Sequence, residues 1–437
     1  MKKISGLLLR LLFFLMILII SSCSKSGDSP TPPPTPPAIT TVSPASGPKN
    51  TTITISGTNF ITDLTKIQVT VNGKTCAVLT ATATTITAQI PAGCGTGNVA
   101  VYFSGIKYDG PVFNFVYTYT LTSVSNGVRG FLNGPIATAK FDDLWGVMID
   151  PNDNIFVTEN MNPRIRKITS SGMVSTLAGD GIPGDVDAQG SNAEFKGMRS
   201  SSMDQTGNVY VAALDEIKKI DINGNVTTLV HTPFNFMGIK VMKSGNIYVS
   251  GFSDIAKYTS TGTLIWRLRS HAPVSGNVDG DTSIVQFYLY GNIEVDDAEK
   301  NIYVQHLNTG VGSGTGSQLK KLDLTNRTIT TIAGDGTEGD LIVNNNPLAC
   351  KFRMIASTLF DNSGGIYLAV SGNSKICYLK DGAIKTIIDG AYASYQDVDG
   401  DASIGRAATP YGLAFDSKGQ VFIGCININK IKKLVID

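Results

Sequence analysis

The side chains that most often bind metals are sparse in this sequence. It has only three histidines, His231, His271 and His306, so a metal site with three histidine ligands would need all of them. Acidic residues instead recur in turns, the longest being Asp397-Val398-Asp399-Gly400-Asp401. This run has the spacing of half a calcium-binding loop but lacks the glutamate that would complete it. Turn geometry is therefore the preferred explanation, with calcium as the alternative.

The six cysteines could support packing, disulfides or nucleophilic chemistry. Cys76 and Cys94 flank two expected strands, and in an exported chain we predict that they form a disulfide. Cys350, Cys377 and Cys425 lie beside no obvious catalytic histidine, so we predict packing thiols there and leave their pairing open. No catalytic residue is assigned.

Charge and composition restrict the class of protein. The chain carries 36 Lys and Arg against 35 Asp and Glu, so no basic excess draws it to nucleic acid. Charged residues are only 16% of the 437, whereas Gly reaches 46 and apolar residues 42%. This balance is typical of a turn-rich, exported all-β protein and excludes a helical bundle. The length predicts two or three domains.

The first 37 residues indicate export and a tether. Lys2 and Lys3 precede an apolar run from Leu7 to Ile20, the length of a signal-peptide core. The run ends in Ile20-Ser21-Ser22-Cys23, which resembles the lipobox of bacterial lipoproteins. That resemblance implies that residues 1–22 are removed and that Cys23 is lipidated; a cleaved secretory signal and an uncleaved anchor are the alternatives. Residues 23–37 are Pro-rich and are expected to be extended. We predict a lipid anchor in the bacterial outer membrane, and leave open whether the protein lies on its periplasmic face or on the cell surface.

Residues 38–117 alternate in the manner of short strands, with turn signals such as Asn72-Gly73 between them. This pattern predicts an immunoglobulin-like β-sandwich. Four motifs resemble the IPT/TIG family: residues 42–48 (VSPASGP), 55–60 (ISGTNF), 71–73 (VNG) and 90–93 (IPAG). The resemblance implies a spacer or a domain that contacts protein or glycan, rather than a catalyst.

Residues 118–437 repeat six times. Each unit has a β-branched strand after a turn and then a strand with basic residues, as in residues 155–157 (IFV) and 165–168 (IRKI). The units recur every ~40 to 65 residues, a spacing typical of propeller blades. We predict that the basic residues face solvent beside buried Ile and Leu. The last unit lacks an outer strand, and residues 119–127 resemble the end of a unit without its beginning, so the N-terminal strand should close the last blade.

Residues 165–181 and 330–336 resemble the NHL repeat. The predicted fold is therefore all-β: an IPT/TIG sandwich followed by a six-bladed NHL-type β-propeller. This domain order also resembles envelope lipoproteins of Bacteroidota, which often belong to glycan-capture systems.

The repeat places candidate binding residues at the mouth of the propeller channel. Loops before the innermost strands carry Trp145, Arg199, Tyr290 and Tyr411, and loops after the second strands carry Glu159, Asn160, Arg164, His306 and Asn427. Aromatic rings can stack on sugar rings, and polar side chains add directed hydrogen bonds. The leading hypothesis is thus a binding module for a polysaccharide or oligosaccharide.

Three alternatives stay open. The rings could seal the channel while the polar groups cap loops, or the propeller could be a scaffold for an envelope protein. A metal-dependent hydrolase or lyase is the third, because some propellers, the gluconolactonase-like and amidating-lyase ones, carry an axial metal. At the matching positions Glu159 and His306 offer one carboxylate and one imidazole, too few for a metal cage, so no metal or other cofactor is assigned.

Overall fold

The computed structural model describes residues 35–271, 277–308, 316–361, 363–390 and 397–437. The predicted signal peptide and Cys23 lie outside these residues, so the lipid anchor stays a prediction. Helical structure in the described part is limited to short 3₁₀ turns: η1 (Leu64–Lys66), η2 (Gly190–Asn192), η3 (Pro347–Ala349) and η4 (Ser371–Asn373). Across those same ranges, no helix has the length and apolar character needed to cross a membrane.

The N-terminal domain is a β-sandwich around one core, as predicted. Alternation builds it: Ile53 and Ile55 of one strand are fully buried, and the residues between and beside them are not. The strand order is β1-β3-β6-β5-β4-β7-β8-β2. The strands are β1 (Ala38–Ser43), β2 (Ser46–Gly47), β3 (Thr52–Thr58), β4 (Ile67–Val71), β5 (Lys74–Ala81), β6 (Thr85–Gln89), β7 (Gly97–Phe103) and β8 (Ile106–Phe115). Asn72 and Gly73 form the β4–β5 turn with φ of 48° and 79°.

Cys76 and Cys94 lie in the core of this sandwich as free thiols. The disulfide predicted from the sequence is therefore not formed in the structure. Burial raises the pKa of the Cys76 thiol to about 11, so the group stays protonated and packs as a small apolar side chain.

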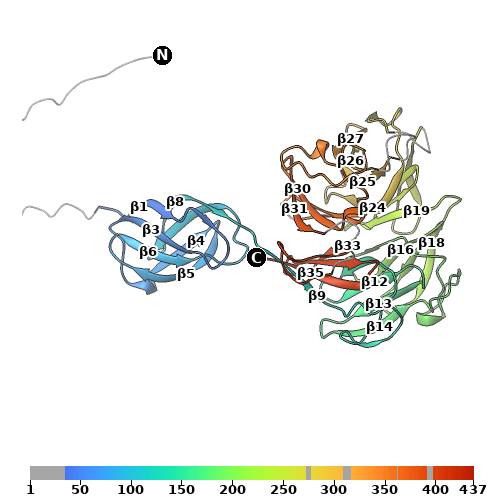
Figure 1. Cartoon of the computed structure of the whole chain (residues 1–437), viewed down its shortest axis with the longest axis horizontal. Coiled ribbons are helices and arrows are strands. Elements are labelled where there is room, and N and C mark those ends of the chain that lie inside the picture. Colours follow the sequence, from blue (N-terminus) through green and yellow to red (C-terminus); the bar gives the residue numbers. More distant parts are fainter. Residues whose placement is uncertain (1–34, 272–276, 309–315, 362, 391–396) are drawn as a thin grey trace, which may run out of the picture.

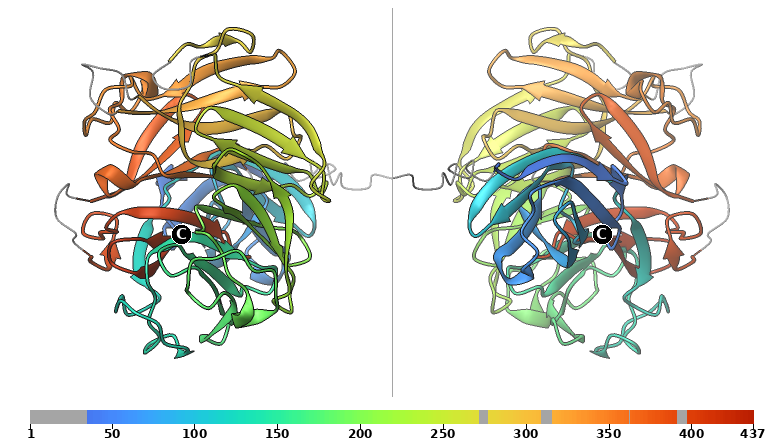
Figure 2. Two further views of the ribbon diagram at one scale, coloured as in Figure 1. Left: turned by 90° about the vertical axis from the view of Figure 1, so that its right-hand side faces the viewer. Right: turned by 90° about the vertical axis from the view of Figure 1, so that its left-hand side faces the viewer.

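The rest of the chain forms a closed ring of six blades beside the sandwich (Figures 1 and 2). The first three blades contain β10 (Gly134–Pro135), β11 (Leu144–Ile149), β12 (Ile155–Glu159), β13 (Arg164–Ile168) and β14 (Met173–Ala178); β15 (Ser200–Met203), β16 (Val209–Ala213), β17 (Glu216–Ile220) and β18 (Val226–His231); and β19 (Phe236–Val241), β20 (Ile247–Gly251), β21 (Asp254–Tyr258) and β22 (Leu264–Arg269).

Blades 4 to 6 follow the same plan. They contain β23 (Gly280–Asp281), β24 (Leu289–Val295), β25 (Asn301–Leu307), β26 (Ser317–Asp323) and β27 (Thr328–Ala333); β28 (Ser357–Phe360), β29 (Ile366–Val370), β30 (Lys375–Lys380) and β31 (Ala383–Asp389); and β9 (Tyr119–Ser123), β32 (Gly400–Asp401), β33 (Pro410–Phe415), β34 (Val421–Cys425) and β35 (Lys430–Ile436). The inner strands contact one another in the cycle β11-β15-β19-β24-β28-β33, which returns to β11 and encloses the axis.

The predicted closure is confirmed. Strand β9 pairs antiparallel with β35, placing Leu121 opposite Leu434, and both side chains are fully buried. Thr118 and Asp437 exchange two backbone hydrogen bonds of 2.8 and 3.0 Å at the sandwich end of this blade. The register of blade 6 puts Phe415 at that end and Pro410 at the other. The loops that precede the inner strands therefore open on the face away from the sandwich.

The prediction that the basic residues face solvent is wrong for the first member of each pair. Arg166, Lys218, Lys320 and Lys432 have fully buried side chains, and we call them the buried cations. The residues that follow them, such as Lys167, are only partly buried. Successive side chains on a strand point to opposite faces, so two adjacent basic residues cannot share one environment, and in each pair the first faces the buried side.

The acidic turns supply the partners of the three lysines among the buried cations, whereas Arg166 pairs with Glu159 of β12. Lys218 lies 2.7 Å from Asp185 and 2.8 Å from Asp187, and Lys320 lies 2.6 Å from Asp279. Lys432 likewise contacts Asp397 and Asp399. Turn geometry thus explains only part of the acidic pattern. Asp401, for example, accepts a bond from its own turn at the Ser403 N–H (2.9 Å).

Candidate ligand-binding site in the propeller channel

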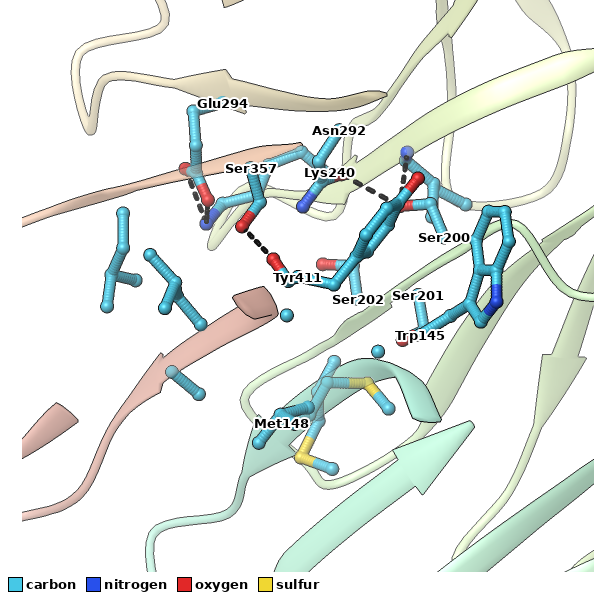
Figure 3. Close-up of a pocket in the computed structure, with 18 of the residues that line it drawn as sticks. Trp145, Met148, Ser200, Ser201, Ser202, Lys240, Asn292, Glu294, Ser357 and Tyr411 are labelled. Atoms are coloured by element: carbon cyan, nitrogen blue, oxygen red, sulfur yellow. Dashed lines mark hydrogen bonds and ion pairs between the residues drawn. The ribbon is translucent and has the colours of Figure 1, made fainter. Parts of the chain in front are cut away.

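A cavity of about 240 Å³ lies at the propeller axis and is lined by residues from all six inner strands (Figure 3). It is smaller than the ~300–1,000 Å³ usual for drug-sized ligands, so it suits one small ring rather than an extended molecule. Gly146 matters to its shape, because a Cβ there would lie 2.1 Å from Ser201 Oγ. The inner strands thus come close enough for polar side chains to meet across the axis.

Two aromatic rings from neighbouring blades stand at the mouth of the cavity. The Trp145 and Tyr411 ring centroids are 4.8 Å apart with an interplanar angle of 46° (Figure 3). Trp145 is partly buried, whereas Tyr411 is only 6% exposed, and this burial raises the pKa of its hydroxyl. The pair therefore offers a rigid apolar corner that a ligand ring entering the mouth would meet.

Polar groups fill the channel below these rings. Ser200 Oγ donates to Asn292 Oδ1 at 2.7 Å, and Ser202 Oγ accepts from the Val241 N–H at 2.9 Å. Deeper still, Lys240 Nζ lies 2.8 Å from the Glu294 carboxylate. The pKa of this carboxyl group is raised overall, because the effect of burial exceeds the opposing effect of the lysine. The channel wall is thus polar, and the one ion pair described in it, between Lys240 and Glu294, has no net charge.

Three of the nine predicted binding residues, Trp145, Arg199 and Tyr411, line this cavity. Tyr290 lies beside the Phe252 ring, with centroids 6.5 Å apart, and does not line it. The polar wall of Ser200, Ser202, Asn292, Lys240 and Glu294 was missed from the sequence. The signal that could have found it is the run of three serines, Ser200 to Ser202, where the first and last units read Gly-Val-Met and Gly-Leu-Ala.

Except for Asn427, the predicted polar residues on the second loops are engaged in the fold. Glu159 is 1% exposed and paired with Arg166 at 3.1 Å. Asn160 Oδ1 accepts from the Met198 N–H at 3.0 Å, and Arg164 donates to the Asp180 carbonyl while stacking on Phe131. Asn427 is exposed at a loop tip.

His306 is a buried acceptor. Its Nδ1 accepts the Tyr288 N–H at 3.0 Å, and burial lowers its pKa to about 3. In the unfolded chain the imidazole regains its ordinary pKa near 6.5, so the stability it contributes is complete above pH 6.5 and is lost as the pH falls toward 3.

His306→Gln keeps an acceptor for the Tyr288 N–H but cannot titrate. We expect the wild type to lose about 2 kcal/mol relative to this variant between pH 7 and pH 5, measured by urea unfolding. An identical pH profile for wild type and His306→Gln would refute the assignment.

One group of potential metal ligands, Asp215, Glu216 and His231, occurs among the described residues. Lys196 already lies 3.3 Å from Asp215 and 2.7 Å from Glu216. These carboxylates are therefore balanced by an ammonium group, and the cluster is not evidence of a metal ion.

Comparisons with known proteins agree with this architecture. Residues 37–119 match the IPT/TIG domain. A Bacteroides thetaiotaomicron protein of unknown function covers 93% of this chain and 99% of its own, with 16% identity and a TM-score of 0.65. No curated protein sequence matches the chain.

Two further structures are described as auxiliary nutrient binding proteins. That from Bacteroides thetaiotaomicron covers 92% of this chain and 98% of its own, with 15% identity and a TM-score of 0.55. That from Bacteroides ovatus covers 94% and 100%, with 16% identity and a TM-score of 0.57. At such identities the likeness concerns the fold. The chain therefore consists of an IPT/TIG domain followed by a six-bladed β-propeller, an architecture that it shares with these Bacteroides proteins over nearly their whole length.

Proposed function

We propose that this protein is a lipid-anchored binding module of the bacterial outer membrane that holds a carbohydrate at the mouth of its propeller channel. The observation that carries the proposal is the Trp145–Tyr411 ring pair above a small cavity walled by hydroxyl and amide groups. Aromatic faces pack on the apolar faces of sugar rings, and serine and asparagine side chains satisfy sugar hydroxyls.

Two further observations support this function. The lipobox-like Ile20-Ser21-Ser22-Cys23 supports export and anchoring. Two of the Bacteroides proteins that share the fold are described as auxiliary nutrient binding proteins, which supports a binding role. The sandwich would then be the spacer between the membrane and the propeller.

The test begins with a glycan array probed with residues 35–437, followed by titration of each positive oligosaccharide. Trp145→Ala combined with Tyr411→Leu should weaken binding by about 2 kcal/mol, or ~30-fold, because both ring contacts are lost while an apolar side chain still fills the site of Tyr411. Affinity within about twofold of wild type would refute the site.

The two tryptophans of the chain allow a direct readout. Trp266 lies on β22, the outer strand of blade 3, 6.2 Å from the Tyr248 ring. In Trp266→Phe the sole indole is Trp145, so its fluorescence should change on binding. In the matched variant Trp145→Phe it should not. No positive oligosaccharide on the array would refute the carbohydrate proposal and favour an envelope protein as the partner.

A further inference from the structure

Arg199 has no carboxylate partner among the described residues, in contrast to two other arginines that are partly or fully buried. Arg166 pairs with Glu159, and Arg267 lies 2.7 Å from Asp254. The Arg199 guanidinium forms no ion pair or hydrogen bond with any residue in the described ranges, and its Nε is buried without a partner. It nevertheless lines the channel cavity beside Trp145 and Tyr411.

The other charges near the cavity do not compensate Arg199. Lys240 and Glu294 neutralise each other at 2.8 Å. Asp143 faces the Trp145 indole, but no described carboxylate lies within the 4.0 Å of an ion pair with Arg199. Leaving a partly buried guanidinium unpaired is costly, so this position favours a ligand that brings the missing negative charge.

A second unpartnered group completes the pattern. Ser201 Oγ is also buried without a hydrogen-bond partner and lines the same cavity, two residues after Arg199 in sequence. A guanidinium presents parallel N–H groups that match a planar carboxylate, whereas a hydroxyl suits a neutral sugar oxygen. The lining of this one cavity therefore offers one position for an anionic partner, at Arg199, and one for a neutral partner, at Ser201.

We propose that the ligand is an acidic carbohydrate whose uronic acid residue places its carboxylate on Arg199. Its ring packs in the corner formed by Trp145 and Tyr411, and a ring hydroxyl bonds Ser201 Oγ. This inference rests on the proposed carbohydrate-binding function and names the class of sugar that the site selects.

The experiment compares sugars that differ only at C6. Methyl glucuronide, galacturonide and mannuronide are titrated against the matching methyl glucoside, galactoside and mannoside, using Trp145 fluorescence in Trp266→Phe and calorimetry of the wild type. At least one uronide should bind about tenfold tighter than its neutral partner, since a charge-assisted bidentate contact is lost in the latter.

Arg199→Gln should remove this preference by weakening the uronide about tenfold and the neutral sugar little. Arg199→Lys, which keeps the charge but not the planar fork, should be intermediate. Arg269→Gln is the matched control, because it removes a cation whose side chain is 67% exposed on β22 and should leave every affinity unchanged. Because Arg199 has no partner to lose, its Gln variant should unfold at a temperature no lower than the wild type.

Each failure has a distinct reading. Equal binding of both members of every pair, with no effect of Arg199→Gln, would overturn the uronic acid inference and leave the carbohydrate proposal standing. Uronide preference that survives in Arg199→Gln would also overturn it. Binding of none of the six sugars, together with a silent glycan array, would overturn both.

Discussion

Arg166→Met is expected to lower the free energy of unfolding by about 3–5 kcal/mol, because it leaves a buried carboxylate without its cation. Arg166 bonds Glu159 and also donates to the Lys140 and Leu132 carbonyls, at 3.1 and 3.0 Å. Both members of the ion pair are 1% exposed or less, so water cannot replace the lost bonds. Urea unfolding at pH 7 measures the loss.

Lys167→Met is the matched control. Lys167 is adjacent on the same strand, but its side chain is only partly buried, so its loss should cost under about 1 kcal/mol. Adding Glu159→Leu to Arg166→Met removes the orphaned carboxylate and should recover most of the stability. The Lys140 and Leu132 carbonyls keep only the long backbone bonds that these two residues exchange, at 3.4 and 3.2 Å, so recovery should be incomplete.

The pH dependence separates this explanation from simple loss of packing. Burial already raises the pKa of Glu159 to about 7 in the presence of Arg166, and removal of the cation raises it further. The folded variant then holds a proton that the unfolded chain releases above its ordinary pKa of 4.5. Wild type and Arg166→Met should both lose stability as the pH rises above about 4.5, but the decline ends near pH 7 in the wild type and continues in the variant, so the difference between them should widen above about pH 7. A loss equal to that of Lys167→Met, or one independent of pH, would contradict the buried-pair explanation.

Arg166 also shows where sequence analysis stops. Strand alternation and the recurring unit were enough to predict the sandwich, six blades and closure by β9. They did not show which basic residues are buried, because alternation puts adjacent side chains on opposite faces of the sheet without showing which face is covered by other parts of the chain. The sequence nevertheless contains a finer signal. The third unit has Ala256 at the position of the buried cations, and the loop that leads into this unit, between His231 and Phe236, is short and has no acidic turn. The missing basic residue and the missing acidic turn together suggest that the two pair in the units that carry a buried lysine.

The candidate site was predictable only in part. Trp145, Arg199 and Tyr411 were placed by their position at the start of inner strands, which the repeat fixes. The repeat also places Glu159 and Asn160 on loops at the channel mouth, but both side chains have partners within the fold. Glu159 accepts a hydrogen bond from Arg166, and Asn160 accepts one from the Met198 N–H. Backbone N–H groups that lack a partner thus tend to bind the polar side chains of nearby loops, and the sequence does not show which of these side chains remain available to a ligand.

The second large effect is expected at the blade that closes the ring. In blades 2, 4 and 6 a buried lysine and a loop aspartate hold the outer strand. Asp187 accepts the Thr228 N–H at 2.7 Å, Asp279 accepts the Thr331 N–H at 2.6 Å, and Asp399 accepts the Ser123 N–H at 2.9 Å. In blade 6 that outer strand is β9, which comes from the far end of the propeller sequence.

Lys432→Met should therefore do more than destabilise its own blade. Lys432 holds Asp399, at 3.1 Å, and the Val398 and Arg406 carbonyls, at 3.2 and 2.8 Å. Without it the loop that binds Ser123 loses its support. We expect a loss of about 3 kcal/mol in unfolding free energy, together with faster amide hydrogen exchange across β9.

Lys320→Met provides the comparison that isolates ring closure. Lys320 is equally buried and bonds Asp279 and Thr331 Oγ1, but its outer strand β27 is covalently continuous with its own blade. Both variants should lose a similar free energy, yet only Lys432→Met should raise exchange in β9. Unchanged β9 exchange in Lys432→Met would mean that pairing with β35 alone closes the ring. Since β9 is tied to the rest of its blade only through non-covalent contacts, the loss of Lys432 should weaken the closure of the ring as well as its own blade.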